Sequence, residues 1–387
     1  MDDETGEIAQ HETILSLPSA LKIAISPKGD SILVTSEKSE TIKLFSHKSQ
    51  TTEITVPSGT SEARTANGQG FIATNDGEIL ALRLPDGTKL SSWNAKSGLN
   101  PPGRKVEDML PLGDRLFATI QKDSKKGTGN RLVVLNLPTL ALQADLPFPR
   151  NHPELEVKDD PKEQGPGPEI LLAAPESNTL AITLDLYGTV AFANLDAALR
   201  GKWSHLQYVP CSADGRWGTA FPDRAAMFRV GGADYLVIAN AGPDAGLALL
   251  DVARRKVVQF FPTDAGAETP IFLSKSQKIV TVVSGKRKLR KTGEIEADPR
   301  PDRSLLVVDA SPLVAAKKAT LKRIPFDKPV VRVQAVNPGK SEILLLALGA
   351  DASELAVYDL AAEKEITREP AKGPVNRIAV WNGKPAP

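Results

Sequence analysis

The stretch Leu249-Leu250-Asp251 is one copy of a short pattern, two apolar residues followed by a polar one, that decides the fold of this chain. The pattern occurs seven times, each time closing a segment of alternating apolar residues. The copies are Leu44-Phe45-Ser46, Ala81-Leu82-Arg83, Val134-Leu135-Asn136, Phe192-Ala193-Asn194, Leu249-Leu250-Asp251, Val307-Val308-Asp309 and Val357-Tyr358-Asp359. The polar residue recurs after 37 residues and then at intervals of 50 to 58 residues. A repeat of this length, with several short strands per copy and almost no helical periodicity, is typical of a β-propeller.

The first copy indicates how each repeat is built. Ile23 and Ile25 alternate with other residues, residues 26–30 have the composition of a turn, and second and third strands follow at 32–34 and 42–45. A more polar fourth strand is expected near 52–56. Alternation with period two, bounded by Gly, Pro, Asp and Ser, predicts a meander of antiparallel strands. We therefore predict an all-β fold, a seven-bladed β-propeller with four-stranded antiparallel blades.

The prediction treats residues 1–387 as one propeller domain whose ring is closed by the chain termini. The expected blades span residues 21–57, 62–93, 106–146, 169–208, 225–261, 270–324 and 331–368, with 369–387 as a closing segment or tail. Residues 14–17 and 366–368 have the pattern of outer strands, and 375–380 that of an inner strand. One of them should pair the two ends of the chain, which removes exposed sheet edges. The alternative is an incomplete eighth blade.

The repeat resembles the WD-repeat and YVTN-like propellers over nearly the whole chain. Pairs such as Leu250-Asp251, Val308-Asp309 and Tyr358-Asp359 stand where a WD repeat has Trp-Asp, and the Gly-His pair of those repeats is absent. The resemblance therefore implies the architecture and no particular activity.

The amino-acid composition and net charge argue against some classes of function. Apolar residues make up 41% and charged residues 25%, as in soluble globular proteins, and the formal net charge is +1. Without a strong overall charge, nucleic acid is not the expected partner. The longest strongly apolar stretch, 343–348, is too short to cross a bilayer. Residues 1–10 lack the features of a signal peptide, so a cytoplasmic location is expected, or a periplasmic or secreted one if a signal peptide has been removed.

The connections between predicted strands fall into two sets. Those between strands two and three of a blade, and those between blades, emerge at one end of the sheets, and nearly all the long ones belong to this set, including 121–130 and 284–303. Short Gly/Asp turns are expected at the opposite end. Because long loops on a rigid scaffold often carry recognition, we expect binding at the long-loop face.

Two of these loops are basic and supply the candidate binding residues. These are Lys286, Arg287, Lys288, Arg290 and Lys291 in one loop and Lys122, Lys125 and Lys126 in the other. They could contact an acidic partner, a phosphate or a nucleic-acid backbone, or they could form a solvated loop whose cations meet the acidic residues at 294–302.

No catalytic motif is present. The four histidines are scattered, so neither a metal site nor a cofactor is predicted, and Cys211 is interpreted as a structural thiol. Two functions remain open. One is a non-catalytic interaction scaffold or subunit of a larger assembly that binds another protein. The other is a lactonase-like enzyme or a small-molecule sensor using the central channel, for which Arg229, Arg332 and Arg377 are the candidates.

Overall fold

The computed structural model describes residues 21–46, 51–100, 102–121, 130–148, 165–203, 205–288, 295–297, 302–337, 339–371, 373–375 and 377–380. These residues form two compact units. The N-terminal unit includes Leu15–Tyr187 and Ala191–Leu206, and the C-terminal unit includes Gly188–Val190 and Gln207–Val380.

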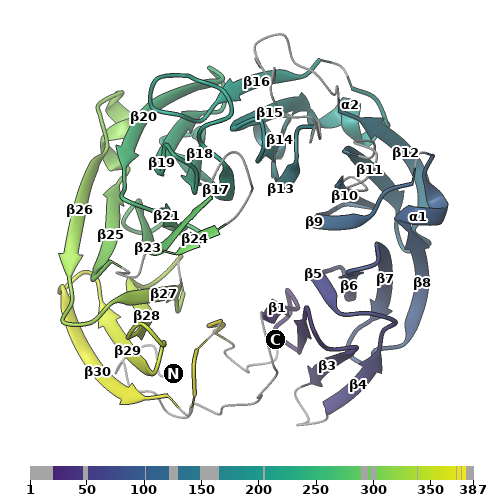
Figure 1. Ribbon diagram of the computed structural model, residues 1–387, viewed down its shortest axis with the longest axis horizontal. Coiled ribbons are helices and arrows are strands. Elements are labelled where there is room, and N and C mark those ends of the chain that lie inside the picture. Colours follow the sequence, from purple (N-terminus) through teal and green to yellow (C-terminus); the bar gives the residue numbers. More distant parts are fainter. Residues whose placement is uncertain are drawn as a thin grey trace. The chain divides into compact units, whose positions relative to one another are not determined.

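Seven antiparallel sheets, each made of consecutive strands, are drawn in Figure 1. The first four blades comprise β1 (Leu21–Ile25), β2 (Ser31–Ser36), β3 (Thr41–Ser46), β4 (Thr51–Thr55), β5 (Thr60–Ala66), β6 (Gln69–Thr74), β7 (Glu78–Arg83), β8 (Lys89–Asn94), β9 (Lys105–Leu112), β10 (Arg115–Gln121), β11 (Arg131–Asn136), β12 (Ala141–Pro147), β13 (Pro168–Ala174), β14 (Thr179–Leu184), β15 (Thr189–Asn194) and β16 (Gln207–Pro210). The last three comprise β17 (Pro222–Val230), β18 (Ala233–Asn240), β19 (Gly246–Asp251), β20 (Lys256–Pro262), β21 (Gly266–Ala267), β22 (Ile271–Leu273), β23 (Lys278–Lys288), β24 (Ile295–Ala297), β25 (Ser304–Asp309), β26 (Thr320–Pro325), β27 (Val330–Ala335), β28 (Ile343–Leu348), β29 (Glu354–Asp359) and β30 (Lys364–Pro370).

The predicted fold class, a seven-bladed β-propeller with four-stranded antiparallel blades, is confirmed. Six sheets have four strands in chain order. In the sixth blade β22, β23, β25 and β26 form the four-stranded body, and β21 and β24 pair with the far part of β23. Few helical segments interrupt the strands: α1 (Ala95–Gly98), α2 (Leu195–Leu199), η1 (Pro175–Ser177) and η2 (Ser311–Ala315). None of the helices in the described residues is long and apolar enough to cross a membrane.

Every copy of the sequence pattern ends the third strand of its blade, because the polar residue starts the turn to the fourth strand. Asp309 Oδ1 accepts a hydrogen bond from the backbone N–H of Ser311 (2.9 Å), and Asp359 Oδ1 accepts one from that of Ala361 (2.8 Å). Asn194 caps the first turn of α2 in the same way. Short Asp and Asn side chains favour turns by this backbone mimicry. The repeat therefore marks a recurring turn.

The core lies between neighbouring blades as well as within them. In the N-terminal unit one buried apolar cluster joins blades 1 and 2, with Leu33 and Ile72, and another joins blades 2 and 3, with Phe71 and Leu116. In the C-terminal unit one cluster joins blades 5 and 6, and another joins blades 6 and 7. A blade cannot bury both faces alone, so each depends on its neighbours for stability.

Connection lengths agree in part with the sequence analysis. Loops at 95–104 and 211–221 lie at the expected end of the sheets, and most of the predicted loop at 147–168 lies outside the described residues. However, the expectation of short turns at the opposite end was wrong in two blades, because residues 195–206 and 310–319 are longer connections that contain α2 and η2. Both join third to fourth strands, and each contains a buried leucine, Leu195 in α2 and Leu313 in η2.

The expected strands near the chain ends have different outcomes. Residues 366–368 lie within β30, as predicted. Residues 14–17 lie outside the described residues. Of the segment 375–380, the described residues do not belong to a strand, and the backbone N–H of Val375 donates to the carbonyl of Ala352 (3.0 Å).

Candidate functional site

The basic stretch at 286–291 begins in a strand, which corrects the prediction of a loop over 284–303. Lys286, Arg287 and Lys288 form the end of β23, where the backbone pairs with β24. A run of β-branched residues at 279–283 favours the strand before them, and the strand also pairs with β21. The remaining predicted binding residues, Arg290, Lys291, Lys122, Lys125 and Lys126, lie outside the described residues.

The backbone register of this hairpin places its three basic residues opposite different types of residue. Arg287 lies opposite Glu296, whereas Lys286 lies opposite Ala297 and Lys288 opposite Ile295. Successive residues of a strand belong to opposite faces, so Lys286 and Lys288 share a face whose cross-strand positions carry no charge. Of the downstream acidic residues, Glu296 is therefore placed opposite Arg287 by the backbone register.

Cys211 has the environment of a structural thiol. Its side chain is fully buried, and its backbone carbonyl accepts a hydrogen bond from Asn240 Nδ2 (2.8 Å). Burial raises the pKa of the Cys211 thiol, which keeps it protonated. A nucleophilic cysteine needs the opposite shift.

The arginines considered for a channel site are engaged within the C-terminal unit. Arg332 Nη1 lies 2.8 Å from Glu268 Oε1. Arg229 donates to the carbonyl of Gly232 (2.9 Å) in the turn between β17 and β18. Arg377 also has an interaction partner. No convergent set of catalytic groups is formed by these three side chains.

An ionic network runs along the first strands of consecutive blades in the N-terminal unit. Lys22 Nζ on β1 lies 3.1 Å from Glu62 Oε2, and Arg64 Nη1 lies 2.6 Å from Glu62 Oε1 on the same strand, β5. Arg64 Nη2 lies 2.5 Å from Asp108 Oδ1 on β9. Asp108 Oδ2 accepts from the backbone N–H of Leu171 on β13 (2.8 Å). The network therefore links four blades.

The electrostatics of this network indicate a structural role. Burial raises the pKa of Asp108, and Arg64 opposes the rise. Burial also disfavours the Arg64 cation, but Asp108 and Glu62 outweigh it and raise the pKa of Arg64. Structural ion-pair networks shift pKa values as functional sites do. Here Asp108 is bound by Arg64 on β5 and by the backbone N–H of Leu171 on β13, so its carboxylate is already engaged.

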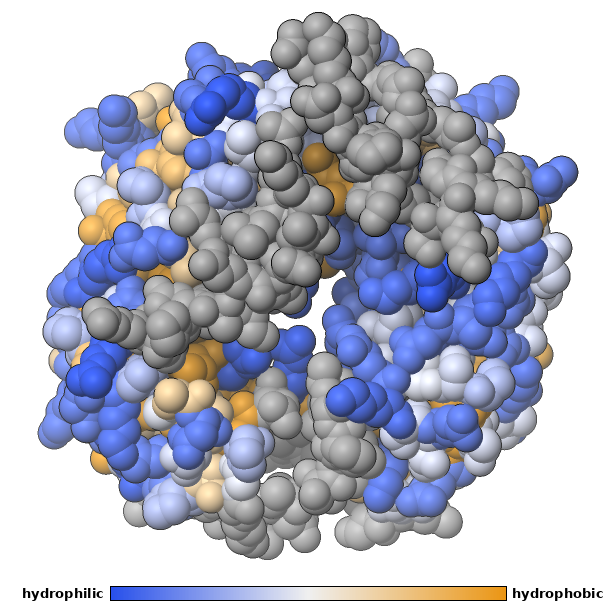
Figure 2. All heavy atoms as spheres, in the orientation of Figure 1, coloured by the Kyte–Doolittle hydropathy of each residue, from blue (hydrophilic) through white to orange (hydrophobic). Residues whose placement is uncertain are grey.

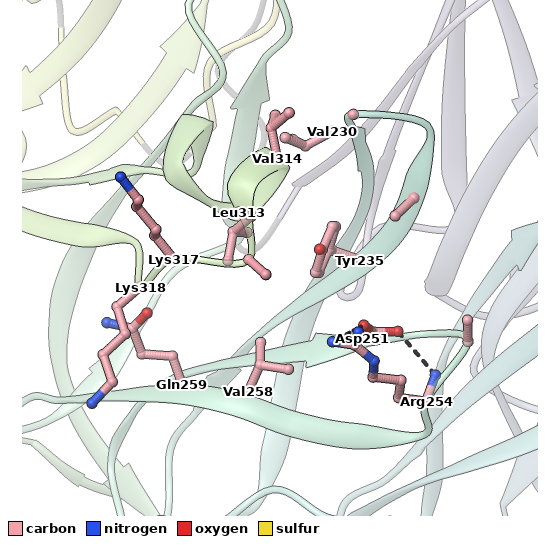
Figure 3. Close-up of a pocket in the computed structure, with 14 residues that line it drawn as sticks. Val230, Tyr235, Asp251, Arg254, Val258, Gln259, Leu313, Val314, Lys317 and Lys318 are labelled. Atoms are coloured by element: carbon pink, nitrogen blue, oxygen red, sulfur yellow. Dashed lines mark hydrogen bonds and ion pairs between the residues drawn. The ribbon is translucent and has the colours of Figure 1, made fainter.

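A pocket of about 560 Å³ lies in the C-terminal unit, at the end of blades 5 and 6 opposite the basic hairpin. Figure 3 shows η2 and the chain after it on one side and strands of blade 5 on the other. The lining residues are Val230, Gly231, Ala233, Tyr235, Asp251, Ala253, Arg254, Val258, Gln259, Leu313, Val314, Ala316, Lys317 and Lys318. This pocket was not predicted from the sequence. The available signal was Ser311-Pro312 after the turn residue Asp309, followed by the pair Lys317-Lys318.

Few large apolar side chains are exposed on the surface of the described residues. Figure 2 shows one face of the molecule, where hydrophilic residues predominate over the N-terminal unit. The large apolar side chains that are exposed among the described residues are Leu90, Leu142, Val314 and Ile366. Of these, Val314 is the most exposed, at 58%, and it is the one that lines the pocket.

Comparison with known proteins identifies solved structures that have a similar fold. No protein-family model matches the sequence, and no curated protein matches it. Solved structures match at the level of the fold. Sqt1 from Saccharomyces cerevisiae is similar with a TM-score of 0.61 and 10% identity, covering 90% of this chain and 85% of Sqt1. U3-55K is similar with a TM-score of 0.56 and 10% identity, covering 87% of this chain and 90% of U3-55K.

A europium-containing methanol dehydrogenase has a TM-score of 0.59 and 11% identity, covering 94% of this chain and 81% of the dehydrogenase. These similarities confirm the resemblance to WD-repeat-like propellers in architecture. The fold is thus shared by an enzyme and by proteins whose names state no enzymatic activity. A fold shared at this level of identity does not determine function, which has to be argued from sites.

Proposed function

We propose that this protein is a non-catalytic interaction scaffold or a subunit of a larger assembly, acting as a single propeller domain. It contacts another protein, one with an acidic surface, through the ends of the sheets that carry the long loops. The observation that carries the proposal is the hairpin formed by β23 and β24.

The hairpin extends a blade beyond its own body. β23 has 11 residues, whereas β28 and β18, the second strands of the other blades in this unit, have 6 and 8. β25 pairs with β23 only as far as Val282. The six residues beyond it span about 20 Å at the usual rise per residue of a strand. Backbone pairing with β21 and β24 gives this extension a defined shape, which suits a contact element on a rigid scaffold.

The positive charge of the extension favours a partner with an acidic surface. Lys286 and Lys288 share a face and are not opposed by carboxylates in the register. Lysines placed in this way raise the rate of encounter with an acidic surface, and salt weakens the effect because the Debye length is about 8 Å at physiological ionic strength.

The test is a comparison of captured partners. The tagged chain is purified from the cells that produce it at low and high salt, and copurifying proteins are identified by mass spectrometry. The double variant Lys286→Ala/Lys288→Ala should lose acidic partners that the wild-type chain retains. The control Lys340→Ala/Lys364→Ala removes the same charge from exposed positions of blade 7 and should retain them.

Two results would refute the proposal. One is a wild-type chain recovered alone that also turns over lactones or sugar acids in a substrate screen. The other is an identical set of partners for the wild-type chain and the hairpin variant.

A further inference from the structure

The pocket between blades 5 and 6 has an apolar floor continuous with the core. Val230, Tyr235 and Leu313 belong to the buried cluster that joins these blades, and Val258 packs near it. Val314 rises from this floor with 58% of its surface exposed. An apolar side chain from a ligand would cover Val314, and removing apolar surface from water is favourable.

A glycine allows the two walls to meet. Gly231 lies in the turn between β17 and β18 with a φ of +58°, and a Cβ built on it would lie 3.2 Å from both Cγ atoms of Val314. Any larger residue would be strained by the left-handed backbone and would also push η2 away. The turn and η2 therefore fix the position of Val314 at the mouth of the pocket.

Cations stand at both sides of this apolar floor. Figure 3 shows Lys317 and Lys318 on one side and Arg254 beside Asp251 on the other. Neither lysine side chain has a carboxylate within ion-pairing distance among the described residues. Asp251 is the lining carboxylate, and it is already engaged by the backbone N–H of Arg254 (2.9 Å) and by the Arg254 guanidinium (3.5 Å). The lining thus carries an excess of positive charge.

The polar groups of the floor favour a ligand with amides. Gln259 Nε2 donates to the carbonyl of Ala319 (2.8 Å), but Gln259 Oε1 is buried without a hydrogen-bond donor. Burying an acceptor without a donor is unfavourable, so a ligand that supplies a donor to Gln259 Oε1 is preferred. Burial and the nearby Asp251 raise the pKa of the Tyr235 phenol, so its hydroxyl remains a donor. A peptide backbone supplies both an N–H for Gln259 and a carbonyl for Tyr235, whereas a simple anion supplies only acceptors.

We propose that this pocket binds a short acidic segment of a partner protein, in which a large apolar side chain lies next to Asp or Glu. The apolar side chain covers Val314, and the carboxylates meet Lys317, Lys318 and Arg254. This inference rests on the proposed function as an interaction scaffold, and it adds a second surface at the end of the sheets opposite the hairpin.

The experiment is a selection of peptides followed by affinity measurements. Random dodecapeptides displayed on phage are selected on the full chain, and enriched peptides are synthesised with a fluorescent label and titrated by polarisation. Enriched peptides should combine a large apolar residue with neighbouring Asp or Glu. Val314→Asp and Lys317→Glu/Lys318→Glu should each weaken their binding about tenfold or more, because each places negative charge against the ligand.

Matched control variants show whether a loss of peptide binding is specific to the pocket. Lys340→Glu/Lys364→Glu makes the same charge change in blade 7 and should bind the peptides as the wild-type chain does. Val314, Lys317 and Lys318 are exposed, so their variants should fold, which the near-ultraviolet circular dichroism spectrum checks. Selection of no acidic peptide, or equal affinity for the pocket variants, would overturn the inference. So would calorimetric binding of inorganic phosphate or octanoate in the pocket without any peptide binding.

The hairpin variant distinguishes this inference from the proposed function. If Lys286→Ala/Lys288→Ala loses partners while peptides are not selected, the pocket proposal fails and the scaffold proposal stands. If the selected peptides bind through the pocket but the hairpin variant retains every partner, the peptide site stands and the role of the hairpin fails.

Discussion

Replacement of Arg64 by methionine removes the cation that contacts both Glu62 and Asp108 in the N-terminal unit. Methionine keeps an unbranched apolar stem of similar width, so the change isolates the guanidinium. It leaves Asp108, whose side chain is 2% exposed, with two backbone donors, the N–H groups of Met109 and Leu171. It also leaves the Met109 carbonyl without the Arg64 Nε donor at 3.1 Å.

The expected loss of stability is about 2–3 kcal/mol at neutral pH. Removing one partner of a buried ion pair costs about 3–5 kcal/mol. The estimate here is lower because 37% of the Arg64 side chain is exposed, so water partly replaces it. The entropy of unfolding is about 2.1 cal/mol/K per residue. For a chain of 387 residues unfolding as a whole, the thermal midpoint should fall by about 2–4 °C.

The effect should depend on pH with a definite sign. The pKa of Asp108 is already raised in the folded chain by burial, and removal of Arg64 takes away the charge that opposes the rise. Asp108 in the folded variant then binds a proton more tightly than in the unfolded chain, so the contribution of this group to stability is greatest at low pH and falls as the pH rises through the range between its unfolded and folded pKa values. The deficit relative to the wild-type chain should therefore be larger at pH 8 than at pH 4.5.

Thermal unfolding followed by circular dichroism at these two pH values measures both quantities. Arg83→Met is the control, since Arg83 forms an ion pair with Asp86 at an exposed turn and its loss should leave the midpoint unchanged. The reasoning is refuted if Arg64→Met unfolds within 1 °C of the wild-type chain, a margin of about 1 kcal/mol for a chain of this size. A deficit that is equal at both pH values would also refute it.

Three further predictions concern single residues. Cys211 should not react with a thiol reagent at pH 8 until denaturant is added, because burial raises the pKa of its thiol; immediate reaction in the native chain would contradict this. Gly59→Ala should lower the thermal stability by about 1–3 kcal/mol, since its Cβ would lie 1.8 Å from the carbonyl oxygen of Glu37. Gly373→Ala, which meets no atom within 4 Å and has no positive φ, should cost less, and equal losses would argue against a clash. Asp359→Ala should cost about 1 kcal/mol through loss of its turn hydrogen bonds, and no change in the denaturation midpoint would disprove that role.

The fold could be predicted from the sequence because its signal is local and repeated. Asp309 and Asp359 determine turns through hydrogen bonds to residues two positions away, and Asn194 and Asp251 accept similar bonds from residues three positions away. Alternation of apolar residues then defines the strands on either side. Because the weak turn pattern occurs seven times, it predicts the propeller architecture although the Trp-Asp pair of WD repeats is absent.

The sites were less predictable because they depend on contacts between distant residues. The basic run at 286–291 was found as a cluster of charge, but the pairing of Lys286 with both Gly266 and Ala297 cannot be derived from composition. The pocket was missed because it needs Val314, Gly231 and Gln259 to meet across two blades. Each of these residues is unremarkable in its own segment.

Both basic surfaces of the C-terminal unit are built on blade 6, at opposite ends of its strands. β23 continues into the hairpin at one end, and β25 leads into η2 and Lys317 at the other. The six residues of β25 separate these ends by about 20 Å. This distance is more than twice the Debye length of about 8 Å at physiological ionic strength, so charges at one end have little influence on binding at the other. Sites this far apart without shared partners usually behave additively. The binding losses of Lys286→Ala/Lys288→Ala and Lys317→Glu/Lys318→Glu toward a partner that contacts both surfaces should therefore add as free energies, whereas a partner that uses one surface should respond to one pair alone.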